Sequence, residues 1–379
     1  MSHLNIGLQY DRSLREFGSA SETFSALTTS FALPTTGTQT SMETTTMRNG
    51  KTASFSFVLA LAFLVNTCSS ARAYQVETAH DHQADIERNA KTDKQLFAAA
   101  KGVLNLKKME IASRIDDLQI PAYVFQPLVT PKNKKLPALV WVYGGIHDHF
   151  GVNYFPFIKE AVEKGYVVIA PEYRGASGYG SDYYNAMDYG GYEVNDILSA
   201  AAHLKEKMPI VDSKRVGVIG WSHGGYISLL SVMREKNSFA CAAAFVPVTN
   251  LVFRLSYKGP EYQRDFVESP RIGGLPHEKR KIYVDRSPLY HVDQLAIPLL
   301  VQVATNDDDV DFVEAEMLVN ALNAKKPDLS EVTVFKDPAG GHFFNRQVDL
   351  KTLQRKDTPT QVESWSQTWR FLDQHLAPR

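Results

Sequence analysis

The sequence predicts one doubly wound α/β domain, whose mostly parallel sheet has helices on both faces. Short apolar runs that do not alternate with polar residues recur along the chain, at 136–143, 166–170, 215–220, 239–246, 298–303 and 332–335. Such runs are typical of strands that are covered on both faces. Segments with helical spacing lie between them, at 155–165, 191–207, 224–236, 312–325 and 360–376. This alternation of strands and helices is the order that builds a parallel sheet.

The predicted strands end at residues that interrupt a strand. The run 136–143 stops at Gly144-Gly145, and 166–170 stops at Pro171. Glycine leaves the backbone free to turn, and proline has no N–H to continue a ladder of hydrogen bonds. We therefore expect loops directly after these strands.

Composition limits the classes of function. The chain has 379 residues, of which 44% are hydrophobic and 22% charged, as in globular proteins. The chain has 41 Lys and Arg residues and 42 Asp and Glu residues, so its net charge is close to zero. The net charge therefore does not indicate binding to nucleic acid or to an anionic membrane surface. Two cysteines cannot form a disulfide scaffold.

The first 73 residues have the pattern of targeting rather than of a fold. Residues 1–46 hold 17 Ser or Thr, and a basic start at Met47 then precedes an apolar run at 55–65 and a small-residue site at 71–73. This order predicts a secretory signal peptide, since the run is shorter than the ~20 residues of a membrane-spanning helix. We expect translation to begin at Met47 or Met42. Lipid attachment at Cys68 is disfavoured, because the residues before it match a lipobox poorly.

The whole chain is therefore predicted to have four parts. These are a disordered leader or misread upstream start at 1–46, a signal peptide at 47–73, an N-terminal helical extension at 74–114, and the α/β domain at 115–379, with a cap insertion at 251–290. The extension is predicted from the helical spacing of apolar residues within 76–103. The cap is predicted because 251–290 is rich in Arg, Tyr, Pro and Gly and breaks the alternation.

The segment Val216–Ile227 contains a G-x-S-x-G motif centred on Ser222. A predicted strand precedes the motif and a predicted helix follows it, which is the context of a nucleophile elbow. The sharp turn that exposes a serine hydroxyl requires neighbours without a Cβ, and Gly220 and Gly224 meet that need. The backbone N–H of His223 then points toward a developing oxyanion, whereas its side chain turns away from Ser222.

A base and an acid are expected after the serine in the chain. His342 lies in a glycine-rich loop directly after the run 332–335, where it can stand over the sheet as a general base. The acid is expected just after the run 298–303, where Asp307, Asp308 and Asp309 are consecutive. Spacing alone leaves the choice among these three carboxylates open.

Several segments resemble the catalytic domain of the prolyl oligopeptidase (S9) family of serine peptidases, which has the α/β-hydrolase fold. They are the nucleophile motif at 220–226, the segment PEYRGASGYG at 171–180, Ser287-Pro288-Leu289 with the following 297–300, and Gly341-His342. The resemblance covers about 115–376 and does not include the family's β-propeller.

The family has its catalytic acid three residues before a valine. Asp307 lies three residues before Val310, so the resemblance implies that Asp307 is the acid, with Asp309 as the alternative. Tyr143-Gly144-Gly145 is similar to the family's Y-G-G-F, which implies that the Tyr143 hydroxyl joins the His223 N–H in an oxyanion hole. The alternative for Tyr143 is an aromatic strand end that packs under the loop.

The resemblance implies a serine hydrolase that cleaves peptide bonds of small substrates through Ser222, Asp307 and His342. The predicted signal peptide at 47–73 implies that the enzyme is secreted or periplasmic. Carboxylester hydrolysis is the alternative, and a catalytically silent binding protein is a more distant one. We expect no cofactor, no metal, no nucleic acid partner and no stable membrane insertion once the signal is removed. The partner is a small peptide or ester substrate. Oligomeric state is not predicted.

Overall fold

The structure of the protein is a computed structural model that describes residues 80–130 and 134–376. The chain divides into two units, Met1–Glu77 and Thr78–Arg379, and the fold below is that of the second. The predicted leader at 1–46 and signal peptide at 47–73, with Cys68, lie outside the described residues.

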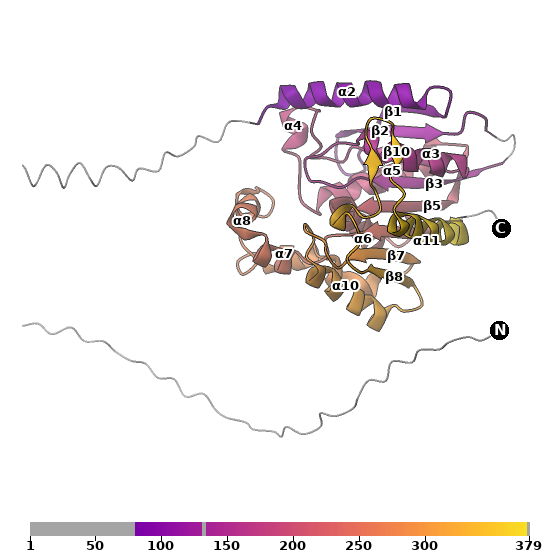
Figure 1. Cartoon of the computed structure of the whole chain (residues 1–379). Coiled ribbons are helices and arrows are strands. Elements are labelled where there is room, and N and C mark those ends of the chain that lie inside the picture. Colours follow the sequence, from indigo (N-terminus) through magenta and orange to yellow (C-terminus); the bar gives the residue numbers. More distant parts are fainter. Residues whose placement is uncertain (1–79, 131–133, 377–379) are drawn as a thin grey trace, which may run out of the picture. The chain divides into compact units, whose positions relative to one another are not determined.

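An eight-stranded sheet forms the centre of the second unit (Figure 1), with the order β1-β2-β4-β3-β5-β6-β7-β8. Strand β1 pairs antiparallel with β2, β2 pairs antiparallel with β4, and the remaining pairs are parallel. The strands are β1 (Asn105–Ala112), β2 (Gln119–Gln126), β3 (Leu136–Val142), β4 (Val167–Pro171), β5 (Val211–Trp221), β6 (Cys241–Phe245), β7 (Leu299–Ala304) and β8 (Ser330–Phe335). A separate small hairpin joins β9 (Val348–Asp349) and β10 (Gln354–Arg355).

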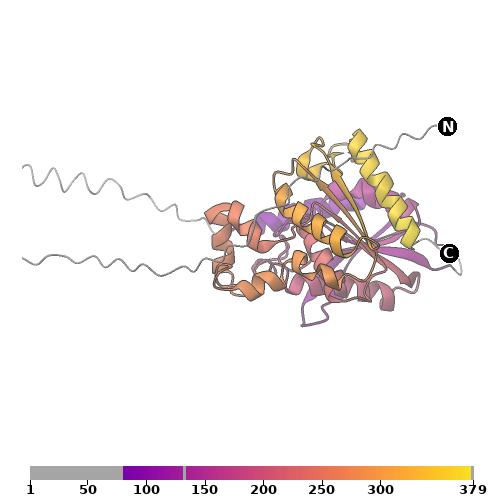
Figure 2. The ribbon, with the colours of Figure 1, turned by 90° about the horizontal axis from the view of Figure 1, so that it is seen from below.

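Helices cover both faces of the sheet, as predicted. Helices α5 and α6 pack on each other and on β5, and α11 crosses the opposite face (Figure 2). The longer helices are α2 (His82–Ala100), α3 (Phe155–Glu163), α5 (Tyr192–Lys207), α6 (His223–Arg234), α10 (Phe312–Lys325) and α11 (Pro359–Leu376). Short helical turns are α4 (Ser181–Tyr184), η1 (Val152–Tyr154), η2 (Pro288–Gln294) and η3 (Gly341–Phe343). Within the residues that the structure describes, no helix is long and apolar enough to cross a bilayer.

The fold class predicted from the sequence is confirmed. Each predicted strand and helix of the α/β domain is present, with ends shifted by a few residues. No propeller occurs in the described part of the chain. The segment 251–290 forms α7 (Leu251–Tyr257), α8 (Gly259–Glu268), α9 (Arg280–Asp285) and the start of η2.

The N-terminal extension differs from its prediction. Of its described residues, which begin at 80, 82–100 are helical and 105–112 form β1, an edge strand that pairs with the unpredicted β2. Most residues of β1 are exposed or half-buried, and the strand carries two lysines. An exposed edge strand lacks the continuous apolar run of a central strand, which explains why β1 was not predicted. Strand β2 is buried over its six central residues and has an apolar run, so exposure does not explain why it was not predicted.

A stack of buried aromatic rings lies at the centre of the core. The rings of Trp141 and Trp365 stack at 6.0 Å, and Trp221 lies 4.9 Å from Trp141. The Trp221 indole N–H donates to Asn345 at 3.0 Å. This packing fixes the end of β5, from which the predicted nucleophile follows. Cys241 is a buried free thiol on β6.

Candidate active site

Ser222 lies on a strained turn between β5, which ends at Trp221, and α6, which begins at His223. Its φ is 53°, in the left-handed region that side chains rarely adopt. Its N–H donates to the Phe245 carbonyl at 2.9 Å, which ties the turn to the neighbouring strand β6. This is the geometry of a nucleophile elbow.

The glycines of the motif are required by close backbone contacts. A Cβ on Gly224 would lie 2.1 Å from the Tyr143 carbonyl oxygen, and one on Gly220 would lie 2.3 Å from the Gly224 carbonyl oxygen. Both distances are far below a van der Waals contact. Only glycine allows α6 to begin this close to β3 and β5.

Gly224→Ala is therefore expected to destabilise the protein by more than about 3 kcal/mol, because the backbone of Val142 and Tyr143 at the end of β3 would have to move. Gly225→Ala is the matched control, since its Cβ would meet neighbours only at 3.1 Å, and we expect a clearly smaller loss. Urea unfolding of both variants measures this. Equal losses would contradict the steric explanation.

His342 and Asp307 form a buried pair. The His342 Nδ1 donates to Asp307, with distances of 2.8 Å to Oδ2 and 2.9 Å to Oδ1, and both side chains are less than 5% exposed. Asp307 Oδ1 also accepts the backbone N–H groups of Asp309 and Val310, at 2.9 and 2.8 Å. These bonds fix the carboxylate. Of the three consecutive carboxylates, the structure thus brings Asp307 to Nδ1, the nitrogen that an orienting acid contacts.

Asp309 lies on the other side of the imidazole. Its Oδ2 is 3.7 Å from His342 Nε2, and its Oδ1 faces Lys258 and Arg254. Burial raises the pKa of Asp309, but the nearby Arg254, Lys258 and His342 lower it more. The pKa of Asp309 therefore lies below the usual value of an aspartate. Asp309 is therefore an anion that is held by two cations from α7 and the residue after it.

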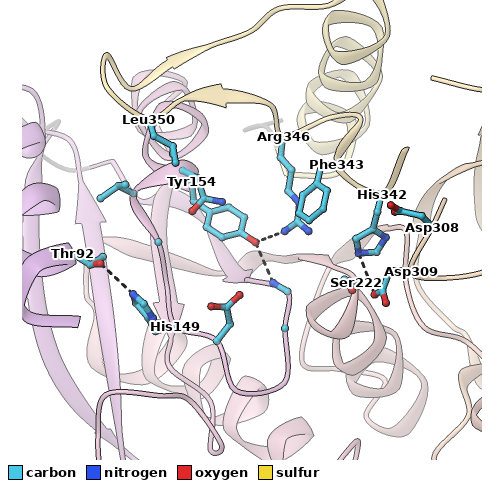
Figure 3. A pocket seen from close by; sticks show the side chains of 16 residues that line it. Thr92, His149, Tyr154, Ser222, Asp308, Asp309, His342, Phe343, Arg346 and Leu350 are labelled. Carbon is cyan, nitrogen blue, oxygen red and sulfur yellow. Dashed lines mark hydrogen bonds and ion pairs between the residues drawn. The ribbon is translucent and has the colours of Figure 1, made fainter. Parts of the chain in front are cut away.

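Ser222, His342 and Asp309 all line one pocket of about 670 Å³ (Figure 3). Ser222 follows β5, Asp307 follows β7 and His342 follows β8, so the carboxyl ends of parallel strands bring them to one edge of the sheet. Within the described residues, Ser222 Oγ forms no hydrogen bond to His342. Such catalytic hydrogen bonds are often long without substrate and shorten when it binds.

Tyr143 does not line this pocket. Its ring stacks on Tyr173 at 4.6 Å, and its hydroxyl donates to the Asp148 carbonyl at 3.4 Å. The side chain is fully buried, and burial together with Glu172 raises its pKa well above the usual value. The ring of Tyr143 is thus packed against Tyr173 at the end of β3, and the role of its hydroxyl in an oxyanion hole stays a prediction.

The backbone N–H of His223 is better placed for an oxyanion. His223 is the first residue of α6, so its N–H has no acceptor within the helix and points out of its positive end. The side chain of His223 is buried and lies near Glu193 rather than on Ser222. Burial lowers the pKa of this imidazole to about 3, so it is a weak base, and neither of its ring nitrogens has a hydrogen-bond partner among the described residues.

Two pocket residues were not predicted from the sequence. The Tyr154 hydroxyl accepts the Gly144 N–H at 3.1 Å and a hydrogen bond from Arg346 Nη1 at 2.6 Å. Tyr154 and Arg346 are 192 positions apart in the chain. Neither belongs to a motif, so no sequence signal points to their contact.

Glu193 makes the stability of the fold dependent on pH. Its Oε1 accepts the Gly190 N–H at 3.1 Å and lies 3.8 Å from His223 Nε2, while its Oε2 is buried without a partner. Burial raises its pKa from 4.5 to about 7. The native state therefore favours the protonated carboxyl, and this contribution is full below about pH 4.5 and is lost as pH rises through 7.

Glu193→Gln, which stays neutral, is thus expected to stabilise the protein relative to wild type by about 1–3 kcal/mol at pH 8 but hardly at pH 4.5. Urea unfolding of both proteins across this range measures the difference. Glu172, whose pKa burial also raises to about 7, is present in both proteins and so cancels. A difference that does not change with pH would contradict the assignment.

Comparison with known proteins shows which family this chain resembles. Residues 153–378 match the model of the prolyl oligopeptidase family. The chain is 29% identical over 282 residues to dipeptidyl aminopeptidase BIII of Pseudoxanthomonas mexicana, covering 70% of this chain and 40% of that protein. It is 30% identical over 258 residues to prolyl endopeptidase FAP of Homo sapiens, covering 65% and 32%.

Solved structures show the same fold. The acylaminoacyl peptidase of Pyrococcus horikoshii superposes with a TM-score of 0.61 at 18% identity, over 75% of this chain and 44% of that chain. The present chain therefore spans less than half the length of the relatives named above. The family match nevertheless covers more than half of this chain, including Ser222, Asp307 and His342, and the chain belongs to the prolyl oligopeptidase family.

Proposed function

We propose that the protein is a serine peptidase that cleaves amide bonds of small peptides through an acyl-enzyme. Ser222 is the nucleophile, His342 the general base, and Asp307 the acid that orients it. The observation that carries this proposal is the buried His342–Asp307 pair, which shares one pocket edge with a serine on a strained elbow. The family match supports a peptidase-type hydrolase.

The geometry supports the following sequence of steps. His342 Nε2 takes the proton of Ser222 as Oγ attacks the substrate carbonyl carbon, and the oxyanion accepts the His223 N–H. Asp307 keeps the proton on Nδ1 and stabilises the imidazolium, which then protonates the leaving amine. Water, deprotonated by His342, hydrolyses the acyl-enzyme and frees Ser222. These steps require no metal or organic cofactor.

Carboxylester hydrolysis is the second candidate, because the same triad and acyl-enzyme cleave esters. The two are separated by assaying the purified chain on peptide anilides and on short p-nitrophenyl esters. We expect both to be turned over, since an amidase triad also cleaves the more reactive ester. Turnover of esters with all peptides inert would overturn the peptidase proposal.

We further propose that the protein is secreted or periplasmic and that residues 47–73 direct its export. The support is the order of basic start, apolar run and small-residue site in the sequence. N-terminal sequencing of the native protein is expected to begin at Tyr74. A native protein that retains 47–73 would contradict export by this segment.

A further inference from the structure

Arg346 is a buried cation in the wall of the catalytic pocket. Its side chain is 9% exposed and lines the pocket together with Ser222. Nη1 donates to the Tyr154 hydroxyl at 2.6 Å, whereas Nε is buried without a hydrogen-bond partner. Among residues 80–130 and 134–376, no carboxylate forms an ion pair with it.

The other two buried arginines of the described chain are paired with carboxylates. Arg174 donates to Asp196 at 2.7 Å and to Asp116 at 2.8 Å. Arg254 lies 3.5 Å from both Glu314 and Asp309. A buried charge without a partner is costly. Arg346 therefore differs from its equivalents in this fold by lacking the anion that a buried guanidinium needs.

Neighbouring groups hold Arg346 beside the nucleophile. A Cβ built on Gly144 would lie 3.3 Å from Arg346 Nη1 and 3.2 Å from Ser222 Cβ, so one glycine separates the two. The guanidinium lies 4.5 Å from the centre of the Phe343 ring and 6.0 Å from that of Tyr154. Figure 3 shows these side chains around the same pocket.

Tyr154 adds a second donor. Its hydroxyl oxygen accepts two hydrogen bonds, from Gly144 and Arg346, and a phenol oxygen has no further lone pair to offer. Within the described chain its own O–H donates to no residue, so it is free to donate to a ligand. Arg346 Nη2 likewise has no hydrogen-bond partner within the described chain and is not among the buried unpartnered atoms, so part of its surface is accessible, and the side chain lines the pocket.

We propose that Arg346 and Tyr154 form a carboxylate-binding subsite beside Ser222, so that the enzyme selects peptides with a free carboxylate near the scissile bond. This inference rests on the proposed peptidase function. A guanidinium and a phenol O–H are matched donors for the two oxygens of a carboxylate. The carboxylate is either the α-carboxylate of a peptide's last residue or an acidic side chain.

The test compares three peptides that differ only at the C-terminal end, on the purified full chain: a free acid, its carboxamide, and a carboxamide in which the last residue is replaced by Glu. We expect kcat/KM for the free acid to exceed that for the carboxamide by about 10- to 100-fold in wild type. A preference for the Glu peptide instead would identify the side chain as the source. Equal values for all three would overturn the subsite.

Variants assign the preference to the proposed groups. Arg346→Met is expected to bring the acid-to-amide ratio close to one, Arg346→Lys to retain part of it, and Tyr154→Phe to lower it less than Arg346→Met. A general loss of activity or stability affects both peptides equally and leaves the ratio unchanged. An unchanged ratio in Arg346→Met would therefore contradict the proposal even if the variant were slow.

A binding measurement tests the subsite even if the protein cleaves none of the three peptides. Each peptide competes with a fluorophosphonate probe that reacts with Ser222, and the free acid is expected to protect wild type at about 10-fold lower concentration than the carboxamide, but not Arg346→Met. If no peptide is cleaved but acids still protect selectively, the peptidase function fails and the subsite stands. If peptides are cleaved without selective protection, the subsite fails alone.

Discussion

Ser222→Ala is expected to lower kcat/KM by about 10⁴- to 10⁶-fold for every substrate that the protein turns over. Alanine keeps the elbow but removes the only atom able to form the acyl-enzyme. Steady-state kinetics with the best anilide or ester from the substrate panel measures the loss.

Ser231→Ala is the matched control for this change. Ser231 lies on the same helix α6, and its hydroxyl donates to the Ile227 carbonyl at 2.7 Å rather than lining the pocket. We expect its activity to stay within about two-fold of wild type, since a helix-interior hydroxyl has only a small effect on stability. Activity that survives in Ser222→Ala would show that another group is the nucleophile.

Asp307→Asn is expected to lower kcat by about 10³- to 10⁴-fold, because an amide donates where His342 Nδ1–H needs an acceptor and so favours the wrong tautomer. The two bonds from the Asp309 and Val310 N–H groups hold the replaced side chain close to its original position. The loss is therefore expected mainly in kcat rather than in KM.

Asp309→Asn and Asp308→Asn provide the comparison within the same run of acids. Asp309 faces Arg254, Lys258 and the Nε2 side of His342. Removing its charge therefore alters the electrostatic potential in the pocket but keeps the hydrogen bond between His342 Nδ1 and Asp307. We expect both variants to keep kcat within about 10-fold of wild type. A larger loss in Asp309→Asn than in Asp307→Asn would reverse the assignment of the acid.

The sequence was sufficient for the parts of the site that depend on local backbone geometry. Gly220 and Gly224 mark a turn that no other residue can make, and His342 follows a strand in a glycine-rich loop, so both signals lie within a few residues of the group they position. Asp307 was less certain from spacing, because its neighbours carry the same side chain. Only the fold shows which of the three carboxylates faces Nδ1.

Other parts of the site depend on contacts across the chain. Tyr143 belongs to a segment that resembles a family motif. The orientation of its side chain, however, depends on stacking against Tyr173 and on burial near Glu172. Tyr154 and Arg346 meet only when η1 and the loop after η3 come together. No local pattern encodes such a contact, and the same holds for the pairing of the edge strand β1.

In the proposed mechanism, Ser222 is the activated nucleophile of this pocket. Reaction of the folded protein with a fluorophosphonate, followed by proteolysis and mass spectrometry, tests it most directly. We expect one adduct, on the peptide that contains Ser222, and its loss in Ser222→Ala. A folded wild-type protein that stays unlabelled, or an adduct that persists in Ser222→Ala, would contradict the claim.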